Sequence, residues 1–214
     1  MCREPAADGL TPRTAELRAG AKLLRQVPVH PIVRPRASFT ADAADAAAMV
    51  DSLALVRELG YPGAVLGVLD ASGSAPDWPL LDRLVAAAEG LSLTFHRAFD
   101  LIADQPSALT GLADLGFARV LTSGRPGRAC DHLDELAALA RLGADRGITV
   151  MAGGGVTAAD VPALLAAGMR EVHASAGGSQ GAMSVDEVHA LAAAAAAATG
   201  PTRFGHESRT TLKS

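Results

Sequence analysis

The sequence predicts an α/β fold in which parallel strands alternate with helices. Five times, a helical stretch ends at a glycine and a short apolar run follows within a few residues. Glycine beyond a helix C-terminus readily takes the left-handed conformation that other residues avoid. Successive glycines lie 21 to 31 residues apart, which is the length of one strand–helix unit. These glycines are Gly60, Gly90, Gly116, Gly147 and Gly168.

Six strands are expected, each short and apolar as in a sheet covered on both faces. They are residues 27–33, 64–68, 91–95, 119–121, 148–151 and 171–174. A helix is expected before them, over residues 12–24, because Thr11 and Pro12 form a helix-start signal. Capping boxes at Thr157 and Ser184 predict two later helix starts.

Two architectures fit this order. Six parallel strands with a leading helix match an eight-stranded barrel without its first strand, helix and second strand. They also match a complete, open, doubly wound sheet. Either way, residues 1–199 are expected to form one domain, followed by a tail at 200–214. In the barrel interpretation, the strands at 27–33 and 171–174 would be the two open edges, which favours self-association.

Composition excludes several classes of function. The formal net charge is −4 and the 19 basic residues are scattered, so neither a nucleic-acid nor an anionic-membrane partner is expected. No apolar stretch is long enough to span a bilayer. The first residues lack the apolar core of a signal peptide, and two cysteines make no disulfide framework. We therefore expect a cytosolic protein.

Polar residues and glycines gather where the expected strands end, which is the functional end of parallel α/β folds. The polar set comprises His30, Arg34, Asp70, His96, Arg97, Asp100, His173 and Ser175. The glycines are Gly153, Gly154, Gly155, Gly177 and Gly178. Strand-end positions carry little core packing, so replacing His96, Arg97 or Asp100 by alanine is expected to abolish ligand binding at a cost of about 1 kcal/mol in stability.

Six segments of the sequence resemble those of the CutC family, in the family's order: PVHPIVRPR, ELGYPGAVLGVLD, LTFHRAFD, ARVLTSG, ITVMAGGGV and EVHASAGG. The resemblance runs from about Gly9 to Gly178. It implies a cytosolic TIM-type (β/α) barrel, a role in copper homeostasis and possible copper binding. It also implies that the front of the barrel is missing and that Cys2 ends the family's second strand, where it is the candidate copper ligand.

The strand-end residues support two hypotheses for the site. His30 and His96 either face a common ligand or are satisfied interior histidines, while His173 lies across the mouth. Arg34 and Arg97 suit a carboxylate or phosphate. The glycines after the last two strands, with Ser175, either bind that anion through backbone N–H groups or only form tight turns.

Acid–base chemistry would need His96 beside Asp100, with Asp70 as a further candidate. The alternative is that Asp100 merely starts the following turn. No lysine ends a strand, which argues against Schiff-base chemistry. Two functions therefore remain open: a copper-homeostasis protein, or an enzyme acting on a small phosphorylated or carboxylated metabolite. A homo-oligomer is compatible with both.

Overall fold

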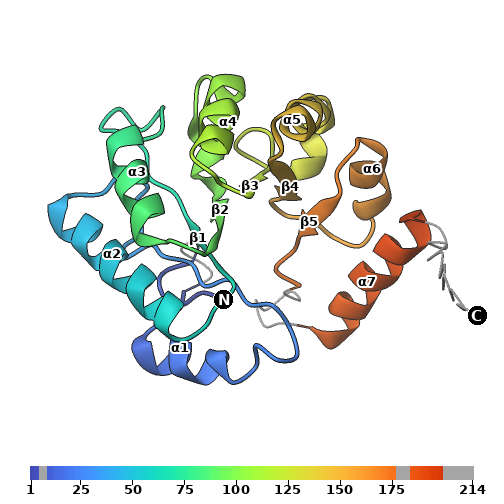
Figure 1. Ribbon diagram of the computed structural model, residues 1–214. Helices are drawn as coiled ribbons and strands as arrows, with labels where there is room; N and C mark the ends of the chain where they lie inside the picture. Colours follow the sequence, from blue (N-terminus) through green and yellow to red (C-terminus); the bar gives the residue numbers. More distant parts are fainter. Residues whose placement is uncertain (5–8, 177–183, 200–214) are drawn as a thin grey trace, which may run out of the picture.

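The computed structural model describes residues 1–4, 9–176 and 184–199. Within them, five parallel strands form one sheet in the order β1-β2-β3-β4-β5 (Figure 1). Each strand therefore pairs with its neighbour in sequence, as in a (β/α) barrel rather than a doubly wound sheet. The strands are β1 (Gly63–Leu66), β2 (Ser92–Phe95), β3 (Arg119–Thr122), β4 (Thr149–Gly153) and β5 (Glu171–His173).

The helices surround the sheet in sequence order, and their ring is open between α1 and α7 (Figure 1). They are α1 (Thr14–Ala21), α2 (Ala43–Glu58), α3 (Trp78–Ala87), α4 (Gln105–Asp114), α5 (Leu133–Arg146), α6 (Val161–Ala166) and α7 (Val185–Thr199). Two 3₁₀ turns, η2 (Arg97–Leu101) and η3 (Ala129–Asp131), follow β2 and β3. The fold is thus an incomplete TIM-type barrel.

The sixth expected strand, at residues 27–33, is not formed, and that prediction was wrong. Its segment makes a single parallel bridge, between Ile32 and Val65 of β1. The Val33 amide donates to the Val65 carbonyl at 2.7 Å, and the Val65 amide donates to the Pro31 carbonyl at 2.9 Å. Prolines lack an amide donor, and the stretch from 28 to 35 contains three of them, so a longer ladder cannot form.

The first residue lies on the other side of this segment. The Met1 amino group donates to the His30 carbonyl at 2.9 Å. The Met1 carbonyl in turn accepts from the Ile32 amide at 3.0 Å. This is the pattern of a parallel pair. The opposite edge of the sheet is β5, which pairs only with β4 among the described residues.

The glycine punctuation is confirmed. All five glycines that were expected to end helices have positive φ angles, between 72° and 93°. Two helix starts were misplaced. The first helix spans only Thr14–Ala21. α6 begins at Val161 rather than after Thr157, although the Thr157 amide donates to the Asp160 carboxylate as in one half of the expected capping box. Ser184 does precede α7, and its hydroxyl accepts from the Glu187 amide.

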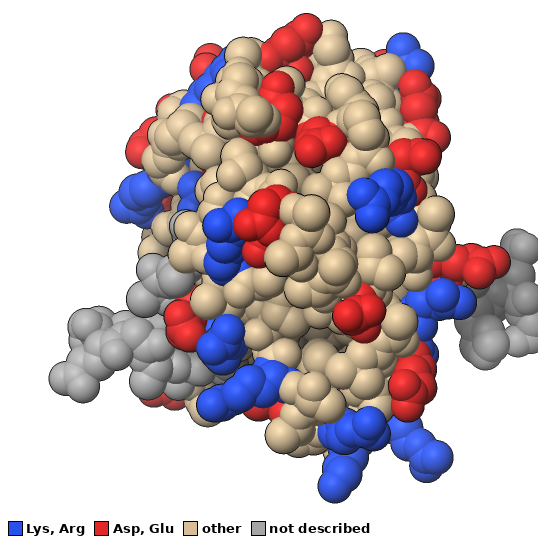
Figure 2. All heavy atoms as spheres, turned by 90° about the vertical axis from the view of Figure 1, so that its left-hand side faces the viewer, with Lys and Arg blue, Asp and Glu red and all other residues tan. Residues whose placement is uncertain are grey.

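The core lies between the sheet and its helices. Leu66, Phe95 and Val120 are paired across β1, β2 and β3, so they share one face of the sheet, and they are wholly buried beneath the helical layer. The other sheet face carries His96, Arg119 and the remaining interior polar groups. None of the described helices is long and apolar enough to cross a membrane. On the face formed by α2 and α3, acidic and basic side chains are interspersed (Figure 2).

Candidate functional site

Three neighbouring segments bring Arg34 and His96 to one level at the C-terminal end of the sheet. The Ile32–Val65 bridge places Arg34 beside Gly67, and the β1–β2 register places Gly67 beside His96. Gly67 has no side chain, so the imidazole lies over it; a Cβ there would be 2.8 Å from the ring. Arg34 and His96 therefore occupy the same layer of the mouth.

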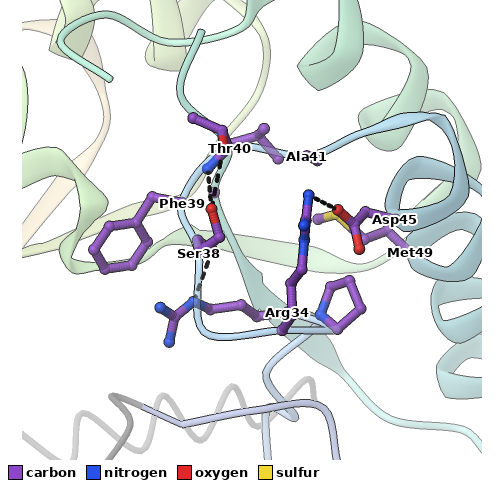
Figure 3. Close-up of a pocket in the computed structure, with 11 residues that line it drawn as sticks. Arg34, Ser38, Phe39, Thr40, Ala41, Asp45 and Met49 are labelled. Carbon is purple, nitrogen blue, oxygen red and sulfur yellow. Dashed lines mark hydrogen bonds and ion pairs between the residues drawn. The ribbon is translucent and has the colours of Figure 1, made fainter. Parts of the chain in front are cut away.

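Phe39 packs against both of these side chains and was not anticipated from the sequence. The Arg34 guanidinium lies 4.4 Å from the centre of the Phe39 ring, and the His96 ring centre lies 5.2 Å from it. Arg34 also donates to the carbonyls of Ser38 at 3.2 Å and Gly9 at 3.2 Å. Figure 3 shows Arg34 and Phe39 in the loop after residue 34, around a cavity of about 10 Å³.

The His96 ring is buried, at 4% exposure. Its Nδ1 accepts a hydrogen bond from the Ala98 amide at 3.3 Å, which caps η2. Its Nε2 has no hydrogen-bond partner among the residues that the structure describes. Burial, and then the positive charge of Arg34, lower the pKa of His96 to about 3. The imidazole is therefore neutral at physiological pH.

Asp100 does not pair with His96, so the expected acid–base pair is absent. Its carboxylate, at 4% exposure, accepts instead from the Thr122 hydroxyl at 2.6 Å and the Ser123 amide at 2.9 Å. It also accepts from Arg97 Nε at 2.9 Å. The Ser123 hydroxyl lies 2.8 Å from the carboxylate and 2.6 Å from the Arg125 carbonyl, and its single proton can serve only one of these two acceptors at a time. Three full donors and the shared Ser123 hydroxyl occupy both oxygens of this carboxylate, so it positions its neighbours rather than transferring protons.

Arg97 extends from the end of β2 across the ends of β3 and β4. Its Nη2 donates to the Ser123 hydroxyl at 3.1 Å and to the Gly127 carbonyl at 3.3 Å. No described residue accepts a hydrogen bond from its Nη1, and 33% of the side chain is exposed. Gly154 lies behind the guanidinium: a Cβ at this position would stand 3.3 Å from Cζ of Arg97 and 3.0 Å from Ser123.

The glycine turn after β4 faces this arginine. Gly154 and Gly155 have φ angles of 124° and 62°, which only glycine adopts freely. The Gly154 carbonyl accepts from Ala129, and the Gly155 carbonyl accepts from Arg128. The amides of both glycines donate to no described residue, so they are available to an anion. Asp70 does not join this cluster, since its carboxylate binds Ser72 in its own loop.

The loop after β3 supports the cluster in a way that the sequence did not reveal. The Nδ1 atom of His132 lies 3.1 Å from the carbonyls of both Ser123 and Arg128. Its Cβ lies close to Gly124, whose φ is 84°. Only the glycine in the TSG segment could have signalled this tight turn.

His30 does not share the mouth with His96. Its ring lies over Gly63, four residues before Gly67 on β1, a separation of roughly 13 Å along the strand. Burial, followed by the charge of Arg119, lowers the pKa of His30. Arg119 pairs with Glu171 at 2.7 Å near the start of the strands. His30 therefore belongs to a polar floor of the interior, and the common-ligand hypothesis for the two histidines was wrong.

His173 on β5 lies beside Gly153, the last residue of β4 before the glycine turn. A Cβ on Gly153 would be 3.2 Å from the Cβ of His173. The His173 side chain is exposed at its surface, but the chain packed around it removes part of its hydration, and this desolvation, followed by the N-terminal ammonium group and Arg97, lowers the pKa of His173. Ser175, two residues further, is exposed. Gly177 and Gly178 lie outside the described residues, so their expected part in anion binding stays a prediction.

The donor set does not fit a tight copper site. Copper(I) prefers several soft ligands that converge. Cys2 is exposed and Cys130 is half-buried; burial, and then a hydrogen bond to Asp160, raise the pKa of the Cys130 thiol. Across residues 1–4, 9–176 and 184–199, no three His, Cys, Asp or Glu side chains are grouped as metal ligands.

Comparison with known proteins shows which family shares this sequence and fold. A sequence model of the CutC family matches residues 1–178. The chain belongs to the CutC family. CutC proteins of Salmonella enteritidis and Klebsiella pneumoniae are 45% and 46% identical over 178 residues, which cover 83% of this chain and 70% of each relative. The HRAFD, LTSG and MAGGGV segments that carried the resemblance are those that form the mouth.

Solved structures agree with this assignment. The CutC protein of Streptococcus agalactiae, named as a candidate copper homeostasis protein, superimposes with a TM-score of 0.76 at 29% identity, over 80% of this chain and 85% of its own. A 3-hexulose-6-phosphate synthase (TM-score 0.59, 19% identity, covering 86% of this chain and 81% of its own) shares the fold alone. A deoxyribose-phosphate aldolase of Coccidioides immitis does so too (0.58, 17%, covering 77% and 68%).

Proposed function

We propose that this CutC-family protein binds a small phosphorylated or carboxylated molecule at the C-terminal end of its sheet. Arg97 and the amides of Gly154 and Gly155 would hold the anionic group. The observation that carries the proposal is the state of Arg97: Asp100 and Ser123 fix its guanidinium, while Nη1 faces no described acceptor. A fixed guanidinium loses little entropy when it binds an oxyanion.

The glycine turn supports the same assignment. Backbone amides in a positive-φ turn form a concave anion site without any side chain. The absence of a Cβ at Gly154 allows the guanidinium to approach the turn closely. The support does not come from a helix dipole, because α6 is short and begins six residues after Gly155.

Whether chemistry follows binding depends on the ligand. Asp100 is saturated and His96 is neutral, so neither offers the general acid–base pair that was expected from the sequence. The reaction, if the ligand is a substrate, would rely on positioning and on hydrogen bonds to developing charge. The enzyme hypothesis therefore keeps its anionic ligand but loses the His96–Asp100 pair.

Copper homeostasis is the second candidate function, and family membership supports it. In this hypothesis the protein works in the cytosol and copper is its cargo. The exposed Cys2 thiol is the accessible soft ligand. We propose that copper(I) binds there weakly, since one thiolate lacks the further ligands of a tight site.

Propylphosphonate tests the anion proposal by calorimetric titration. Arg97→Ala should abolish binding, and Arg97→Lys should weaken it strongly, because lysine keeps the charge but not the fork. Arg83→Ala, which removes an exposed arginine on α3, is the matched control and should bind like the wild type. Equal binding by Arg97→Ala and Arg83→Ala would refute the site.

A further inference from the structure

The His96 imidazole combines two properties that are rarely found together in a protein interior. It is a buried hydrogen-bond donor, and it has no acceptor among the described residues. Because Nδ1 accepts from the Ala98 amide, the ring proton resides on Nε2. A buried donor without a partner costs about 1–3 kcal/mol, so such a group calls for a partner that arrives from outside the chain.

The surroundings of the ring restrict what that partner can be. Arg34 and Phe39 lie beside it, and Gly67 lies beneath it. Arginine only donates hydrogen bonds, and the phenyl and glycine offer no side-chain acceptor. A ligand hydroxyl would bring a proton for which these groups have no acceptor. An oxygen without a proton suits the position.

The charge of that oxygen is restricted as well. The guanidinium of Arg34 makes the local potential positive, which favours an electron-rich oxygen. A full negative charge in so buried a position would carry a large desolvation cost. A carbonyl oxygen meets both conditions, since it carries a partial charge and needs no proton acceptor.

We propose that His96 donates a hydrogen bond from Nε2 to a carbonyl oxygen of the ligand, so that the ligand is a small oxo compound which also carries a phosphate or carboxylate. The inference rests on the proposed function, because Arg97, the next residue along the chain, supplies the anion contact. His96 and Arg97 thus recognise different groups of one molecule. The neutral state of the ring, maintained by burial and by Arg34, keeps Nε2 a donor and keeps Nδ1 on the Ala98 amide.

A matched pair of ligands tests this assignment. 2-Oxopropylphosphonate and propylphosphonate have the same anionic group and chain length and differ in the carbonyl. The wild-type protein should bind the oxo compound about tenfold more tightly, as one buried hydrogen bond to an otherwise unpaired donor requires. In His96→Phe the two should bind equally, because phenylalanine keeps the ring and removes the donor. Thr94→Val, a buried position on the same strand, is the control and should keep the preference.

A spectroscopic measurement on the wild type needs no variant. The carbonyl stretch of bound 2-oxopropylphosphonate should move to lower frequency than in water, and the Nε2 proton of His96 should shift downfield in the NMR spectrum. If both phosphonates bind equally through Arg97 and the stretch is unmoved, the carbonyl assignment is overturned, a water molecule satisfies Nε2, and the proposed anion site stands. If neither phosphonate binds, both proposals fail.

Discussion

Removal of the Asp100 carboxylate should destabilise the protein far more than its place at the end of a strand suggested. Hydrogen bonds from Arg97, the Thr122 hydroxyl and the Ser123 amide converge on this buried group, and the Ser123 hydroxyl shares its proton between it and the Arg125 carbonyl. Removing one partner of a buried ion pair costs about 3–5 kcal/mol, and this pair falls at the lower end because Arg97 is one-third exposed. The Ser123 amide also loses its acceptor, which adds about 1–3 kcal/mol. We expect Asp100→Ala to lower the free energy of unfolding by about 4 kcal/mol, rather than the cost expected from the sequence.

Urea unfolding followed by circular dichroism measures this loss. Asp100→Asn keeps the shape and one acceptor, so it should lose about half as much. Asp82→Ala, an exposed carboxylate on α3, is the control and should unfold at the wild-type urea concentration. A loss below about 1 kcal/mol in Asp100→Ala would show that these contacts do not persist in solution.

Four further results are expected. The folded pKa of His96, about 3, lies below the unfolded value near 6.5, so the unfolded chain binds more protons between these pH values. The free energy of unfolding should therefore fall by about 1.5 kcal/mol from pH 6.5 to pH 5. Urea titrations at each pH should show a smaller fall in His96→Phe. Gly154→Ala should abolish phosphonate binding in calorimetry, because the added Cβ would crowd the Ser123 side chain, the Gly127 carbonyl and the Arg97 guanidinium. Unchanged affinity would contradict the role of the turn in binding. A strong copper(I) chelator should remove all copper from the protein, and stoichiometric retention in Cys2→Ser would reveal a different site. The unpaired edge of β5 should cause self-association in sedimentation experiments, and a stable monomer at high concentration would refute this.

The fold could be predicted from the sequence because its signals are local. Each helix-ending glycine has the positive φ that its position demanded, and the apolar runs that follow form β1 to β5. The segment at 27–33 shows where local signals fail. Its β-branched residues favour a strand, but its prolines remove the donors that a second partner requires, leaving one bridge at Ile32.

The site was predicted less completely than the fold. Their positions at strand ends predicted that Arg97, Asp100 and the glycine turn lie together, and they do, because the C-terminal ends of parallel strands meet at one side of the sheet. The partners of Asp100 were missed, since their choice depends on how η2 packs against β3. The position of His30 near the start of the strands was missed too. It follows from the register between residues 31–33 and β1, which no pattern in this sequence specifies.

Amide NMR during a phosphate titration tests the central claim most directly. If the mouth binds anions, the resonances of Gly154 and Gly155 should shift in a saturable manner, together with the side-chain N–H signals of Arg97. These shifts should vanish in Arg97→Ala and remain in Arg83→Ala. Saturable shifts confined to other parts of the chain, or no shifts at all, would contradict the account.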